Sequence, residues 1–220
     1  MLTQLSAIEA RVLGALIEKE ITTPDQYPLS LNALTNACNQ KTNRDPVLEL
    51  SEAAVQQTLD GLGKRHLVLE RSGFGSRVLK YRHRLCNGDH NPLQLSPQEL
   101  AVVCELLLRG PQTAGELRSR VQRLAPFADL GEVEATIERL VTRPDGPFLV
   151  KLARQPGARE SRYAQLFTGE PTQAIATEEE SYSAPVRESG LADRVTALEA
   201  TVARLSEVIA RLQDRSAPEA

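Results

Sequence analysis

Residues 67–85 read LVLERSGFGSRVLKYRHRL, and this stretch decides how the rest of the chain is interpreted. Leu67-Val-Leu begins a strand, and the two glycines of Ser72–Ser76 indicate a turn. Val78–Leu85 alternates apolar with basic residues, which is typical of a half-buried return strand. The stretch therefore predicts a β-hairpin with two unlike faces. One face holds Leu79, Tyr81, His83 and Leu85, and the other holds Lys80, Arg82 and Arg84.

Three helices are predicted before this hairpin. The first begins at the capping box Ser6-Ala-Ile-Glu9, in which the hydroxyl and the carboxylate bond reciprocally to backbone amides. The second is indicated by the apolar stripe of Leu31, Leu34 and Cys38, and the third spans about Ser51–Arg65. Residues 6–85 are thus predicted to form three helices followed by a hairpin.

The same order is predicted a second time after Gly88–Pro92. Further capping boxes occur at Ser96–Glu99 and Thr113–Glu116, and a third helix starts at Asp129. Strands at Phe148–Arg154 and Ser161–Phe167 follow. We name residues 1–88 copy one and residues 89–168 copy two. Three helices and a hairpin are the order of a winged helix, so we expect a mainly α fold with small β-hairpins (α+β), built as two tandem winged-helix domains.

The end of the chain has a different character. Residues 169–189 are rich in Thr, Glu, Ser and Pro, which predicts a flexible linker. Residues 190–215 carry a heptad stripe, with β-branched residues at a and leucine at d, as in parallel two-stranded coiled coils. The alternative is one amphipathic helix that docks on its own domains, because short helices are marginal alone. The predicted dimerisation residues are Leu191, Val195, Leu198, Val202, Leu205, Ile209 and Leu212.

Composition excludes several classes of protein. The 220 residues are 41% hydrophobic and 25% charged, with a formal net charge of −3, as in ordinary globular proteins. No apolar run is long enough for a transmembrane helix, and no signal peptide is visible at the start. The three widely spaced cysteines do not form a disulfide framework. We therefore expect a cytoplasmic protein that is not bound to a membrane.

The charge is uneven along the chain. Residues 60–85 contain seven basic and two acidic side chains, a local net charge of +5. The third helix of a winged helix can enter the major groove and its hairpin can touch the backbone. Copy one is therefore predicted to bind double-stranded DNA, as a transcriptional regulator would. The predicted contact residues are Lys41, Arg44, Gln56, Gln57, Lys64, Arg77, Lys80 and Arg82.

Two other interpretations stay open, one for the basic strand residues of copy one and one for the third helix of copy two. Outward Lys and Arg on a strand also protect a sheet edge from aggregation. The third helix of copy two carries Glu132, Glu134 and Glu138, which suit a protein contact better than DNA. The alternative function is therefore an adaptor that binds another protein through its winged helices and coiled coil.

Enzymatic and metal chemistry have little support. No glycine-rich phosphate loop, Gly-x-Ser-x-Gly or His-Glu-x-x-His motif is present. His83, Cys86, Asp89 and His90 are residue types that suit Zn²⁺, but their spacing lacks the second cysteine pair of a persuasive site. We expect no cofactor, no metal and no enzymatic activity.

Several stretches resemble the YceH family of bacterial proteins. The similar segments include residues 5–20, residues 22–32, Ala37–Val47, Ser72–Tyr81 and Leu107–Arg120. Asp145–Phe148 and Arg159–Tyr163 are similar as well, so that the resemblance covers about residues 3–168. The resemblance implies two winged-helix domains in tandem. It implies little about function, because the family is essentially uncharacterised and supplies no catalytic residues.

Overall fold

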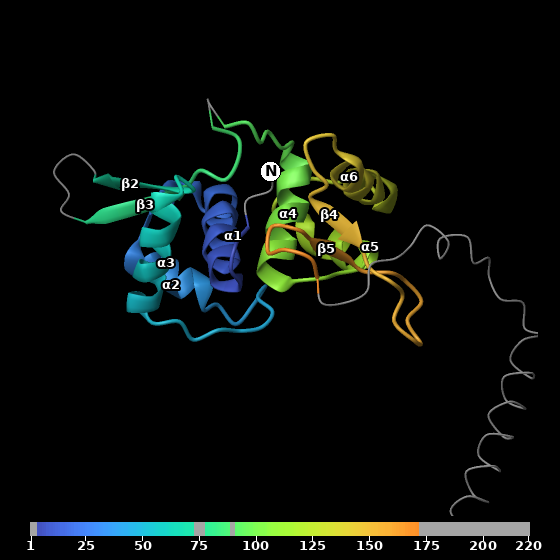
Figure 1. Cartoon of the computed structure of the whole chain (residues 1–220), viewed down its shortest axis with the longest axis horizontal. Helices are drawn as coiled ribbons and strands as arrows, with labels where there is room; N and C mark the ends of the chain where they lie inside the picture. Colours follow the sequence, from blue (N-terminus) through green and yellow to red (C-terminus); the bar gives the residue numbers. More distant parts are fainter. Residues whose placement is uncertain (1–3, 73–77, 89–90, 172–220) are drawn as a thin grey trace, which may run out of the picture. The chain divides into compact units, whose positions relative to one another are not determined.

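The computed structural model describes residues 4–72, 78–88 and 91–171. All of these residues fall in one compact unit, Met1–Ala176. Within them the chain forms six α-helices and two small antiparallel sheets (Figure 1). The prediction of helices with small β-hairpins is confirmed at this level.

Each copy contains three helices followed by two paired strands. Copy one also has a short 3-10 helix and an additional strand between its first two helices. Copy one consists of α1 (Ala7–Thr22), η1 (Pro24–Gln26), β1 (Leu29–Ser30), α2 (Leu31–Cys38), α3 (Glu52–Lys64), β2 (Val68–Ser72) and β3 (Leu79–His83). Copy two consists of α4 (Pro97–Arg109), α5 (Ala114–Val121), α6 (Leu130–Thr142), β4 (Leu149–Lys151) and β5 (Tyr163–Gln165).

The helices begin where their capping residues predict. Reciprocal capping boxes form at the starts of α1, α4 and α5. Ser51 accepts a hydrogen bond from the amide of Ala54 at the start of α3, and Asp129 accepts one from Glu132 at the start of α6. Local side-chain hydrogen bonds, which depend on only four consecutive residues, thus fix these boundaries.

The sheet of copy one has a strand that the sequence did not predict. β1 pairs with β3, so that the strand order is β1-β3-β2 and β3 lies in the centre. β1 has only two residues, too few for an alternating pattern to be recognised, and it ends at Ser30, the N-cap of α2. The predicted two-stranded hairpin is therefore one part of a three-stranded sheet.

The two copies share one hydrophobic core. Helices α1 and α4 lie side by side (Figure 1), and each is buried along most of its length. Gly14 of α1 allows the close approach, because a Cβ atom there would lie 3.0 Å from Cγ of Leu108 on α4. The Cys104 thiol also donates a hydrogen bond to the Gly14 carbonyl, at 3.5 Å. The α1–α4 contact thus joins the copies into a single body.

We expect glycine-to-alanine substitutions in α1 and α3 to have opposite effects on stability. Alanine normally stabilises a helix interior by about 0.5–1 kcal/mol relative to glycine. Gly61 of α3 has no atom within 4 Å of the added methyl group, so Gly61→Ala should give this gain in urea unfolding. Gly14→Ala instead forces the methyl group against fully buried Leu108 and should cost about 1–2 kcal/mol net. Equal gains for both variants would contradict the close α1–α4 contact.

Two parts of the sequence prediction fall largely or wholly beyond the described ranges. The linker at 169–189 is described only up to Pro171, and the heptad helix at 190–215, with its seven dimerisation residues, lies outside the described residues. The predicted homodimer therefore stays a prediction. None of the helices in the described ranges is long and apolar enough to cross a membrane.

Candidate nucleic-acid interface

Four cationic side chains share one face of the copy-one sheet. The register of β2 and β3 pairs Arg71 with Lys80 and Leu69 with Arg82. Directly paired residues point to the same side of a sheet. Arg84 continues this alternation just after β3, where its amide donates a hydrogen bond to the Leu67 carbonyl, at 2.7 Å. We call Arg71, Lys80, Arg82 and Arg84 the basic face.

The charge of the basic face is little neutralised. Among the described residues, the carboxylate that pairs with it is that of Glu20, near the end of α1, whose Oε1 lies 3.9 Å from Nη2 of Arg82. Within residues 4–72, 78–88 and 91–171, no carboxylate pairs with Arg71, Lys80 or Arg84 within 4.0 Å. Those three side chains are exposed, so their charge is available to a partner.

Protection of a sheet edge does not account for the basic face. Edge strands carry outward Lys and Arg to discourage pairing with other chains. β2 is an edge strand, and Arg71 on it fits this explanation. Lys80 and Arg82 instead lie on the central strand β3, whose backbone is already paired on one or both sides. A second reason is therefore needed for the cations of β3.

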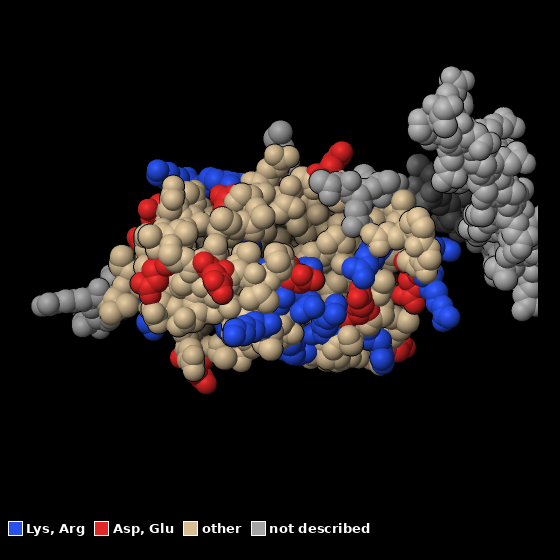
Figure 2. Space-filling model, turned by 90° about the horizontal axis from the view of Figure 1, so that it is seen from below, with Lys and Arg blue, Asp and Glu red and all other residues tan. Residues whose placement is uncertain are grey.

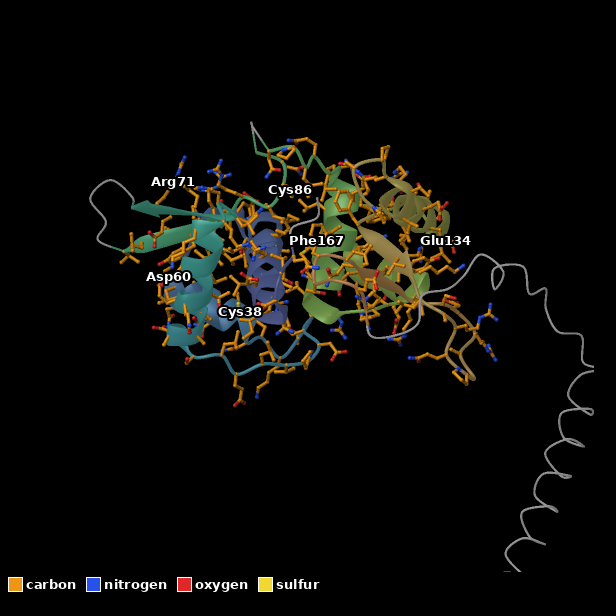
Figure 3. The ribbon with its side chains drawn as sticks, viewed as in Figure 1. Cys38, Asp60, Arg71, Cys86, Glu134 and Phe167 are labelled. Atoms are coloured by element: carbon orange, nitrogen blue, oxygen red, sulfur yellow. The ribbon has the colours of Figure 1, made fainter. Side chains whose placement is uncertain are left out.

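The third helix lies on the opposite side of the sheet from the basic face. Tyr81, on the other face of β3, donates a hydrogen bond from its hydroxyl to Gln56 of α3, at 3.0 Å. The side chains of Val68 and Glu70 line a hollow with α3. Figure 3 shows Arg71 and Asp60 of α3 on opposite sides of the strands. The predicted +5 segment is therefore divided between two surfaces.

The outward residues of α3 are less suited to reading DNA than predicted. Gln56 accepts the Tyr81 bond and also donates to Asp60, at 2.8 Å, so both ends of its amide are engaged. Gln57 and Lys64 are exposed. Viewed from below, away from Arg71, the surface carries acidic and basic side chains interspersed rather than one positive field (Figure 2). The stronger positive surface is thus the basic face of the sheet.

The remaining predicted contact residues are Lys41, Arg44 and Arg77. Lys41 is exposed in the segment between α2 and α3. Arg77 lies outside the described residues. Arg44 is a correction, because its guanidinium is completely buried and bonded to Glu18, with Nη2–Oε2 at 2.5 Å. Arg44 is therefore a structural residue that cannot reach a phosphate.

Arg44 belongs to a buried charged network that the sequence analysis missed. Glu18 of α1 accepts hydrogen bonds from Arg44 and from Arg123 of copy two, the latter at 2.5 Å. Arg123 also bonds to Glu105 of α4, at 2.9 Å. Glu18 and Glu105 are buried, and a glutamate within an otherwise apolar helix face was the available signal. The network ties the segment after α2 to copy two.

Burial and the two arginine partners shift the pKa of Glu18 in opposite directions. Burial alone would raise the pKa of Glu18, but the hydrogen bonds and charges of Arg44 and Arg123 outweigh it. The pKa of Glu18 is consequently held below its ordinary value. Glu18 is therefore ionised at neutral pH.

Of the residues considered for zinc, His83 is used for another contact and Cys86 is buried as a thiol. His83 is buried, and its Nε2 lies 2.5 Å from Oε2 of Glu20. That hydrogen bond is the main reason that the pKa of Glu20 is lowered. Burial and the charge of Glu20 raise the pKa of the Cys86 thiol to about 12, which disfavours the thiolate that binds metals. Asp89 and His90 lie outside the described residues, and within the described ones no cluster could hold a metal ion.

Comparisons with known proteins agree on one family. The family model described as "Protein of unknown function, DUF480" matches residues 5–158. A UPF0502 protein of Pectobacterium atrosepticum is 58% identical over 209 residues, which cover 95% of this chain and 98% of the relative. A UPF0502 protein of Shewanella halifaxensis is 57% identical over 215 residues, which cover 96% of this chain and 100% of the relative. The chain therefore belongs to the DUF480 (UPF0502) family of uncharacterised bacterial proteins.

Proposed function

We propose that this protein is a tandem winged-helix protein that binds nucleic acid through the basic face of copy one. The helix and strand order of each copy supports the winged-helix assignment. Arg71, Lys80, Arg82 and Arg84 then contact phosphates of the backbone, and α3 contributes little to base recognition. Phosphate contacts fix the position of a protein on a duplex but carry no sequence information.

The observation that carries this proposal is the charge balance of the basic face. Four cations lie on two paired strands, with one carboxylate nearby that is already bonded to His83. Guanidinium groups donate two parallel hydrogen bonds to a phosphate, which makes arginine a preferred phosphate contact. Three of the four cations are arginines, so the face matches the chemistry of a nucleic-acid backbone.

Copy two supports a second candidate function, that of an adaptor for another protein. Glu134 and Glu138 of α6 are exposed. The pKa of Tyr163 is raised mainly by burial, and the negative charges of Glu138, Glu134 and Glu160 raise it further. Such a surface repels phosphates. We therefore place copy two outside the nucleic-acid surface, where its α6 is free to meet a basic protein partner.

Binding of a labelled DNA duplex should depend steeply on salt. If all four cations of the basic face contact phosphates, the plot of log affinity against log salt concentration should have a slope of about −3 to −4. Fluorescence anisotropy between 50 and 300 mM salt measures this slope, and two duplexes of unrelated sequence should give similar affinities. Absence of binding at the lowest salt would reject the proposal and leave the adaptor as the better candidate.

A further inference from the structure

A hollow of about 550 Å³ opens beside the basic face. This volume lies within the roughly 300–1,000 Å³ that is typical of small-ligand sites. Strand residues form one side, and the end of α1, the segment 86–88 and the start of α4 form the rest. The lining residues are Glu20, Leu69, Arg71, Arg82, His83, Arg84, Cys86, Asn87, Gly88 and Leu100.

Both cationic and apolar side chains line the hollow. Arg71, Arg82 and Arg84 contribute three guanidinium groups, against the single carboxylate of Glu20. Leu69, Cys86 and Leu100 contribute apolar surface. A ligand that suits both kinds of side chain carries a multiply charged anionic group and an apolar or aromatic part. A phosphate linked to a nucleoside has both features.

Two buried nitrogen atoms of the lining residues have no hydrogen-bond partner. They are Nε of Arg82 and Nδ1 of His83, a residue that is only 5% exposed. Buried polar atoms in folded proteins are nearly always paired. Within the described part of the chain, both unpaired nitrogens thus belong to residues that line the hollow.

The shape of the hollow limits which phosphates can enter. A phosphate within a continuous duplex is linked to a nucleotide on both sides, so it meets these arginines only at the mouth of the hollow. The phosphate at the end of a strand, or that of a free nucleotide, has one side free and can enter further. Such a phosphate monoester also carries up to two negative charges instead of one, which suits three arginines.

We propose that this hollow is a binding site for the phosphate monoester of a nucleotide, held by Arg71, Arg82 and Arg84 with the nucleoside against Leu69 and Leu100. The inference deepens the proposed function, because its three arginines belong to the basic face. The nucleotide is either the 5′ end of a nucleic-acid strand or a free nucleoside monophosphate. Both sources present the same chemical group to the arginines.

The test compares two blunt duplexes of identical sequence, one with 5′-phosphates and one with 5′-hydroxyls, together with calorimetric titration of adenosine monophosphate into the full chain. If strand ends are the source, we expect the phosphorylated duplex to bind at least about tenfold more tightly. If free nucleotides are the source, we expect one molecule of adenosine monophosphate to bind per chain. Either result supports the site, and both together support a site that accepts either source.

Two matched variants assign the effect to the hollow. Arg84→Gln removes an exposed cation that lines the hollow and should abolish the tenfold advantage or weaken adenosine monophosphate binding at least about tenfold. Lys80→Gln removes an exposed cation of the basic face that does not line the hollow, and it should weaken both duplexes equally. Circular dichroism confirms that both variants are folded.

The outcomes separate this inference from the proposed function. Equal binding of the two duplexes with no binding of adenosine monophosphate overturns the phosphate-monoester site and leaves the basic face as a backbone contact. Binding of adenosine monophosphate without binding of any duplex supports the site and overturns the proposed function. Nucleotide binding that Arg84→Gln leaves unchanged overturns the assignment to this hollow.

Discussion

Arg44→Met should destabilise the protein by about 3–5 kcal/mol, because removing a fully buried partner of Glu18 leaves that buried charge with one arginine in place of two. Arg44 is completely buried and holds Glu18, the Ala37 carbonyl and Gln40 by hydrogen bonds. The variant strips Glu18 of one of its two arginine bonding partners. Urea unfolding measured by circular dichroism gives the change in free energy.

The matched control is Arg65→Met, which breaks an exposed ion pair with the same substitution. Arg65 bonds to Glu9 at 2.9 Å, but its side chain is 37% exposed. Exposed pairs contribute at most about 1 kcal/mol. If the two variants lose similar free energy, the buried network does not hold the segment after α2 against copy two.

At acidic pH, the free energies of unfolding of the wild type and of Arg44→Met should differ less than at neutral pH. The folded state holds the pKa of Glu18 below its ordinary value of 4.5, so folding is favoured wherever Glu18 is ionised in both states. That contribution is complete above pH 4.5 and is lost as the pH falls through the lower pKa of the folded state. Unfolding at pH 7 and at pH 3 should therefore show a smaller effect of the substitution at the lower pH.

The network also explains why the sequence could not place Arg44. The segment Asn39–Pro46 is polar and lacks glycine. A cation in such a segment is normally exposed, and the sequence offered no sign that it is covered. Arg44 is bonded to Glu18, and Glu18 is bonded in turn to Arg123 of copy two, which lies 79 positions after Arg44 in the chain. A contact of this range depends on tertiary packing that no local pattern contains.

Local patterns were sufficient wherever the deciding interactions are themselves local. The capping boxes predicted where helices begin, and alternation placed Tyr81 and His83 on the buried face of β3. Alternation placed Leu79 on the same face as Tyr81 and His83, but its side chain is 46% exposed. Leu79 is exposed because it lies at the end of β3 that is far from α1. The same holds for the candidate site. The pairing of two neighbouring strands brings its cations together, which the sequence indicated, whereas the position of α3 on the other side of the sheet depends on tertiary packing and could not be predicted from local patterns.

Reversing two charges on the basic face should weaken nucleic-acid binding far more than reversing two exposed charges outside the basic face. Arg71→Glu combined with Lys80→Glu changes a directly paired, exposed couple that has no carboxylate partner in the described part of the chain. We expect duplex affinity at physiological salt to fall on the order of 100-fold, and the salt slope to fall in magnitude by about 2. The loss should be the same for unrelated sequences, because phosphates carry no sequence information.

The control reverses Lys41 and Lys64 to glutamate, which alters the net charge of the chain by the same amount. Both side chains are exposed, and Lys64 lies on α3, behind the sheet. Screening at physiological salt confines charge effects to roughly 8 Å, so this variant should change affinity less than about threefold. A larger loss in the control than in the basic-face variant would mean that α3 meets the duplex, as in a recognition helix, and that the basic face does not. Because the two variants share the change in net charge and alter exposed side chains, they differ mainly in whether those side chains belong to the basic face, and the comparison tests the binding surface directly.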